Sequence, residues 1–94
     1  MGDASVGFDG FPDIDLDAEL SAFQGSRELD SSVQLFHFTF CLLYAGKAWQ
    51  TVPLDAPSAE LAAATMDQFV ALLNDTAKRL RFPPSITWRS GECG

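Results

Sequence analysis

The chain has 94 residues, of which 47% are hydrophobic, and a formal net charge of −7. This length supports one hydrophobic core and is too short for two domains of ordinary size. Eight Phe and two Trp supply ample apolar surface for a core, so the composition is not that of a disordered chain. We therefore expect a single globular domain over residues 13–90, a flexible acidic arm over 1–12 and a loose tail over 91–94.

The first predicted element is a short helix over about 15–24 that ends at Gly25. From residue 13 the sequence reads Asp-Ile-Asp-Leu-Asp-Ala-Glu-Leu, and such alternation of acidic and apolar residues is typical of a strand. Asp, however, is rare in strands, and Leu16, Leu20 and Phe23 recur at the steps of a helix whose acidic first turn suits the helix dipole. The helix is the better interpretation.

An aromatic and β-branched run over 33–44 predicts a buried strand. Ala45-Gly46-Lys47 then predict a hairpin turn, and residues 48–52 predict the return strand. The alternative is a mostly α-helical protein in which residues 31–45 form a helix, because periodicity does not separate a fully buried helix from a fully buried strand. We favour the strand.

The strongest helical pattern runs from about Pro57, which suits a first helical turn, to Leu80. Its apolar residues recur at three- and four-residue steps, and polar residues that include Asn74 fall on the other side. Phe82-Pro83-Pro84 ends this helix, and residues 85–89 have the composition of a strand. The predicted fold class is α+β: a short N-terminal helix, a β-hairpin, a long amphipathic helix and a C-terminal strand, with the helices on one face of a small sheet.

No residue pattern matches a catalytic, nucleotide-binding or metal-binding motif. His37 is the only histidine, and no potential nucleophile is spaced from it as in a known motif. Asp13, Asp15 and Asp17 alternate like the ligands of a calcium loop, but positions 18 and 24 lack the Gly and Glu that such a loop requires. We expect no enzymatic activity, no metal site and no cofactor.

The two cysteines, Cys41 and Cys93, form neither a disulfide framework nor a zinc-ligand pattern. The first residues do not resemble a signal peptide, and the longest apolar run, over 33–46, is too short to span a bilayer. The sequence therefore predicts a cytoplasmic protein without a membrane anchor.

The negative charge lies in the first 30 residues, which hold eight acids and one base, whereas residues 31–94 hold five acids and five bases. Nucleic acids and anionic membranes require clustered Lys and Arg, so neither suits this segment as a partner. We predict a non-enzymatic protein-binding module, such as a small acidic adaptor, inhibitor, immunity-type or regulatory protein, that engages a basic partner surface. The predicted partner-binding residues are Asp13, Ile14, Asp15, Leu16, Asp17 and Glu19.

Three other interpretations stay open at this point. The acidic segment can be a solvated surface whose apolar half covers the domain's own sheet. Alternatively, the protein can be a small ligand-binding domain or enzyme with a pocket between the sheet and the long helix, where His37 and Tyr44 supply the polar groups. The edges of a small sheet also predict a homodimer that forms through the sheet or the long helix.

Overall fold

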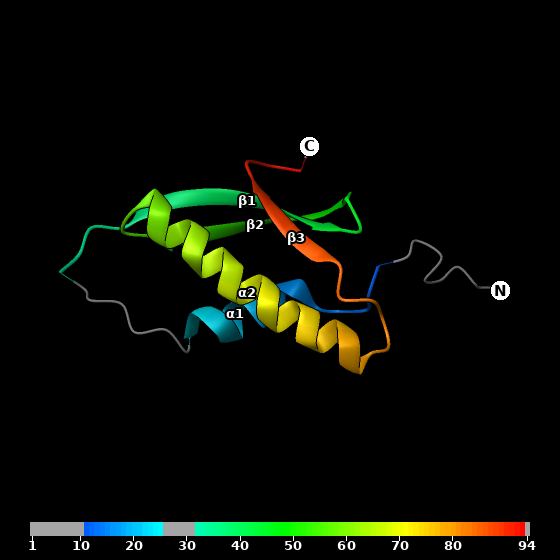
Figure 1. The fold of residues 1–94 in the computed structure, drawn as a ribbon. Coiled ribbons are helices and arrows are strands. Elements are labelled where there is room, and N and C mark those ends of the chain that lie inside the picture. Colours follow the sequence, from blue (N-terminus) through cyan, green and yellow to red (C-terminus); the bar gives the residue numbers. More distant parts are fainter. Residues whose placement is uncertain (1–10, 26–31, 94) are drawn as a thin grey trace.

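The computed structural model describes residues 11–25 and 32–93 (Figure 1). It is a small single α+β domain in which the elements follow the order α1 (Leu16–Gly25), β1 (Phe36–Tyr44), β2 (Lys47–Ala56), α2 (Ala59–Arg79) and β3 (Ile86–Ser90). The strands form one antiparallel sheet in the order β2-β1-β3. Both helices lie on the same face of this sheet (Figure 1), so the predicted fold class is confirmed.

The central strand β1 settles the choice between strand and helix for this part of the chain. It pairs with β2 along its whole length and with β3 over its second half, from Phe40 to Tyr44. Phe40, Leu42 and Tyr44 are buried on the helix-covered face, as the two-residue period of a strand requires. The prediction of a strand is confirmed, although it begins at Phe36 rather than at 33, and the helical alternative for 31–45 is wrong.

The hairpin between β1 and β2 turns at Ala45 and Gly46, within the predicted turn, and Lys47 is already the first residue of β2. Both residues have positive φ, 53° and 82°, and Tyr44 pairs with Lys47, which are the features of a two-residue type I′ turn. The register shifts between Leu42 and Leu43, where Trp49 is the extra residue of β2. β2 therefore presents Trp49 beside Tyr44, with their ring centroids 6.2 Å apart.

The long helix α2 begins at Ala59, two residues later than predicted, because Ser58 is its N-cap. The Ser58 hydroxyl accepts a hydrogen bond from the Leu61 N–H at 3.2 Å, so Pro57 precedes the cap instead of occupying the first turn. At the other end Arg81 has φ 68°, and the Phe82 N–H donates to the Ala77 carbonyl at 2.9 Å. This is a Schellman ending with Arg in the position that usually holds Gly.

The core lies between the sheet and the two helices. Its largest fully buried side chains come from all parts of this interface and are Phe69, Leu42, Leu54, Met66, Leu73 and Val52. α1 contributes Leu16 and Leu20, which are 2% and 6% exposed. Core side chains therefore fill the space in which a pocket between the sheet and the long helix was considered.

The other face of the sheet carries the remaining residues of β1, and no helix of the described residues covers it (Figure 1). Two features of this face were not expected from the sequence. Cys41 and Cys93 form a disulfide, and the N–H groups of Gly91 and Cys93, in the predicted loose tail, donate to Thr39 and Thr51 of the sheet. The sequence did not reveal the bond because 52 positions separate the cysteines and only the sheet brings them together.

Within the described residues, β2 is an edge strand, and it contains Pro53 opposite Thr39. Thr39 directs its carbonyl away from β2, toward the N–H of Gly91 at 2.9 Å. Pro53 thus stands at a position where the ladder to β1 needs no donor. No helix in the described part of the chain is long and apolar enough to cross a membrane.

Candidate functional site

The best candidate for a functional surface is the acidic side of the segment that leads into α1. Asp13, Asp15, Asp17 and Glu19 are all exposed, and we call these four residues the acidic surface. The larger apolar residues between them do not share this exposure: Leu16 is buried in the core and Ile14 is half-buried against it, whereas Ala18 is exposed. The segment therefore directs its charge to solvent and its larger aliphatic side chains to the domain itself.

Contacts on its N-terminal side hold this segment in place. The ring of Phe11 stacks on Trp49 at a centroid distance of 5.7 Å and lies 6.3 Å from Tyr44, which attaches the chain to the hairpin end of the sheet. Pro12 is buried, and its carbonyl accepts a hydrogen bond from the Ile14 N–H at 2.9 Å. Phe11 and Pro12 belong to the predicted flexible arm, and the structure places both in contact with the domain; the rest of that arm, residues 1–10, lies outside the described residues.

The four carboxylates differ in what they do for the fold. Asp15 is the N-cap of α1, because its Oδ1 accepts from the Ala18 N–H at 3.1 Å and its carbonyl accepts from the Glu19 N–H at 3.0 Å. Asp17 accepts a hydrogen bond from the Gln50 side chain at 3.0 Å. Asp13 and Glu19 stand at exposed positions beside them.

The basic residues of α2 and the following strand do not neutralise this surface. In the part of the chain that the structure describes, no ion pair joins its carboxylates to any Lys or Arg. Four cations lie at the C-terminal end of α2 and on β3, namely Lys78, Arg79, Arg81 and Arg89. Of these, Arg89 donates a hydrogen bond to the Cys93 carbonyl at 3.3 Å and not to a carboxylate of the acidic surface. The charge of the acidic surface thus remains available to an external cation.

His37 lies on the opposite, helix-free face near the start of β1. Its Nδ1 is 2.9 Å from Oδ1 of Asp55, its cross-strand neighbour on β2, and the two side chains are 67% and 54% exposed. Beside this pair is a shallow, open depression of about 180 Å³, which Gln24, Pro53 and Leu54 also line. The depression is far more open than a pocket that buries most of a small ligand.

Tyr44, the second residue of the predicted pocket, belongs to the other face and the other end of β1. It is 7% exposed, and its hydroxyl donates to the Pro83 carbonyl at 2.9 Å, which connects the end of β1 to the turn after α2. The two positions differ by seven residues along the strand, which is an odd interval, so their side chains point to opposite faces. The structure therefore does not bring His37 and Tyr44 together.

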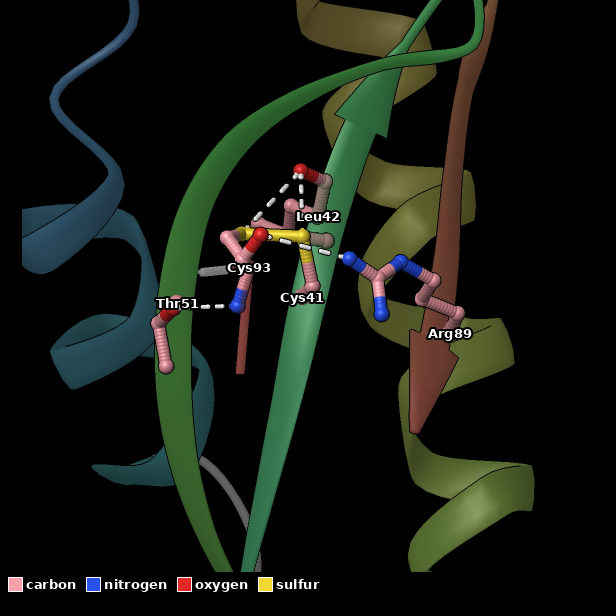
Figure 2. Close-up of a disulfide and its surroundings, with 5 residues drawn as sticks. All are labelled: Cys41, Leu42, Thr51, Arg89 and Cys93. Atoms are coloured by element: carbon pink, nitrogen blue, oxygen red, sulfur yellow. Dashed lines mark hydrogen bonds between the residues drawn. A yellow bond between two sulfur atoms is a disulfide. The ribbon is translucent and has the colours of Figure 1, made fainter. Parts of the chain in front are cut away.

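Two features of the structure were not predicted from the sequence, namely the disulfide and the hydrogen bonds of Asn74. Figure 2 shows Cys41 on β1 joined to Cys93, with Thr51 of β2 and Arg89 of β3 on either side. One sequence signal was available: in a strand in which Phe40 and Leu42 face the core, Cys41 must face away from it. Asn74 was predicted to lie on the solvent side of α2, but its side-chain nitrogen and oxygen both form hydrogen bonds with the main chain of Ile86.

Neither metal ligands among the described residues nor a match to a known protein assigns a chemical activity to the chain. Among residues 11–25 and 32–93, no group of three or more His, Cys, Asp or Glu side chains is arranged to hold a metal ion. No protein-family model, no curated protein and no solved structure matches the chain. The predicted cytoplasmic location stays a prediction, and the disulfide is one observation against it, because such bonds persist mainly in oxidising compartments.

Proposed function

We propose that the protein is a non-enzymatic protein-binding module whose acidic surface docks on a basic partner. The observation that carries this proposal is that the four carboxylates are exposed, whereas Leu16 between them is buried in the core and Ile14 is half-buried against it. The fold thus presents several negative charges on a short, fixed segment, and none is neutralised by a described cation. Leu16 leaves the set of partner-binding residues, because it is 2% exposed.

The expected partner carries clustered Arg or Lys side chains. Arg suits this surface better than Lys, because its planar guanidinium binds a carboxylate through two parallel hydrogen bonds. Charges at the rim of an interface act mainly on the rate of association, and their effect decreases as salt screens it. Complex formation should therefore be fast at low ionic strength and become slower as salt is added.

The test removes charge from the acidic surface without disturbing the helix cap. In the variant D13N/D17N/E19Q, Asp15 stays in place because it caps α1, and Asn at position 17 still offers an oxygen to Gln50. The control variant E60Q/D75N/E92Q removes the same number of negative charges from exposed positions elsewhere in the described chain. Both variants have the same net charge, so a difference between them reports position and not total charge.

Proteins captured from a lysate by the wild type and both variants are compared by mass spectrometry, and the affinity of a captured candidate is then measured by titration at several salt concentrations. We expect the acidic-surface variant to bind about tenfold more weakly, since each exposed ion pair contributes about 0.2–1 kcal/mol. The control variant should bind like the wild type. Equal binding by all three proteins, or an equal loss of binding in both variants, refutes the proposal. The acidic surface is then an ordinary solvated surface.

A second copy of the chain is also a proposed partner, through α2. Leu61 and Leu72 are 52% and 51% exposed and are spaced by three helical turns, so they lie on the same side of the helix. Sedimentation velocity at high micromolar concentration should show a dimer that the variant L61E/L72E loses. A wild-type monomer under these conditions removes this proposal without affecting the one above.

A further inference from the structure

The segment after β3 crosses the helix-free face of the sheet, and we call Gly91, Glu92 and Cys93 the strap. The chain turns at Gly91, which has φ +91° and donates its N–H to the Thr39 carbonyl of β1. Two residues later the Cys93 N–H donates to the Thr51 hydroxyl of β2 at 2.9 Å. The strap thus extends from β3 across β1 to β2, and Figure 2 shows its end, Cys93, between Cys41 of β1 and Thr51 of β2.

The strap covers one side chain in particular. Cys41 lies in the middle of β1 and points away from the core, on a face that no described helix covers, yet it is 0% exposed. Its neighbours on the same face of β1 differ, since Thr39 and Leu43 are half-buried and His37 is exposed. The burial of Cys41 is therefore a consequence of the strap and of the bond to Cys93.

The rest of the domain is held by contacts on the other face. β3 pairs with β1 from Ile86 to Ser90, and its Trp88 donates to Asp67 of α2 at 2.9 Å. The core residues between the sheet and the helices include neither cysteine. Release of the strap consequently removes its own hydrogen bonds and the cover over Cys41, and leaves the strand pairing and the core unchanged.

We propose that the strap is a cover that reduction of the Cys41–Cys93 disulfide releases while the domain stays folded. Cys93 is half-buried, whereas Cys41 is fully covered, so the sulfur of Cys93 is the one that a dithiol reductant can reach. One thiolate of the reductant attacks Cys93 Sγ, and the sulfur–sulfur bond breaks with Cys41 as the leaving thiolate. The second thiol of the reductant then displaces Cys93. The products are two protein thiols, which hold the two protons of the reductant, and one oxidised dithiol.

The consequence is a sheet face with two states. In the oxidised protein the strap hides Cys41, and in the reduced protein the middle of β1 carries an accessible thiol next to Thr51. This inference does not rest on the acidic surface, which belongs to the helix side of the molecule. A failure of either proposal is therefore distinguishable from a failure of the other.

The experiment uses the full chain before and after treatment with dithiothreitol. Hydrogen exchange followed by NMR measures each amide, circular dichroism measures helix content, and iodoacetamide followed by mass spectrometry measures thiol accessibility. After reduction we expect the protection of the Gly91 and Cys93 amides to fall by about tenfold or more, while the amides of β1 opposite β3 keep theirs. Both thiols should become alkylated in protein that retains its helix content.

The variant C93S separates the bond from the reagent. It cannot form the disulfide, so without reductant it should show the exchange pattern of the reduced wild type and an alkylated Cys41, and dithiothreitol should change nothing further. Two results overturn the proposal. Loss of helix content on reduction shows that the bond maintains the whole fold, and an unreactive Cys41 in folded, reduced protein shows that the strap stays in place.

Discussion

Replacing Asn74 with Ala tests how β3 is fastened to α2. The Asn74 side chain accepts a hydrogen bond from the Ile86 N–H at 2.9 Å and donates one to the Ile86 carbonyl at 3.1 Å. Both main-chain groups therefore point toward α2, and the amide of Asn74 takes the place of a neighbouring strand at this position. N74A removes both partners and leaves Ile86, which is 2% exposed, without them.

The expected cost follows from these two bonds. Each hydrogen bond contributes about 1 kcal/mol net, so their loss costs about 2 kcal/mol. Ala is a better helix former than Asn by about 0.5 kcal/mol, which offsets part of this loss. The free energy of unfolding should fall by about 1.5 kcal/mol, which corresponds to a decrease in Tm of about 6–12 °C for a domain of this size.

Chemical denaturation with guanidinium chloride, followed by circular dichroism, measures this change. The matched control is Q68A, which alters an exposed residue of the same helix and should change stability by less than about 0.5 kcal/mol. In addition, the Ile86 amide should lose protection against hydrogen exchange in N74A. If N74A is no less stable than Q68A, the two hydrogen bonds do not hold β3, and the account of this contact is refuted.

Three further substitutions test the core and the two ends of α2 in the same denaturation assay. F69A should cost about 3–5 kcal/mol because Phe69 is 1% exposed in the core, and a cost below about 1 kcal/mol would contradict its burial. S58A should cost about 1 kcal/mol because it removes the acceptor of the Leu61 N–H, and an unchanged midpoint would show that the cap contributes nothing. R81G should stabilise the protein by about 0.5–1 kcal/mol because Gly adopts the positive φ of this position without strain, so a less stable variant would argue against the helix ending described above.

The sequence predicted the elements well because each has a local signature. The aromatic run of β1, the turn at Ala45 and Gly46 and the apolar period of α2 identify their own structure within a few residues. The predicted start of α2 was too early because Pro57 suits a first helical turn, whereas the capping bond of Ser58 places the first turn after it. Such errors at element ends come from single side-chain contacts that periodicity does not contain.

The parts that sequence could not supply depend on contacts between distant segments. Nothing local states that β3 pairs with β1, and that pairing is what carries Cys93 back over Cys41. The acidic segment could be read as a strand or a helix, and only its packing shows that Leu16 is core while the carboxylates around it are exposed. The composition thus identified the candidate surface, and the structure was needed to separate the residues that can meet a partner from those that cannot.

Pro53 has a consequence for how far this sheet can grow. An incoming strand that tried to extend the sheet beyond β2 would find no N–H at Pro53. An unprotected edge strand is a site at which sheets of different molecules pair with one another. The missing donor at Pro53 removes one hydrogen bond from any such pairing on the β2 side, so a single imino acid weakens this edge as a template for further strands.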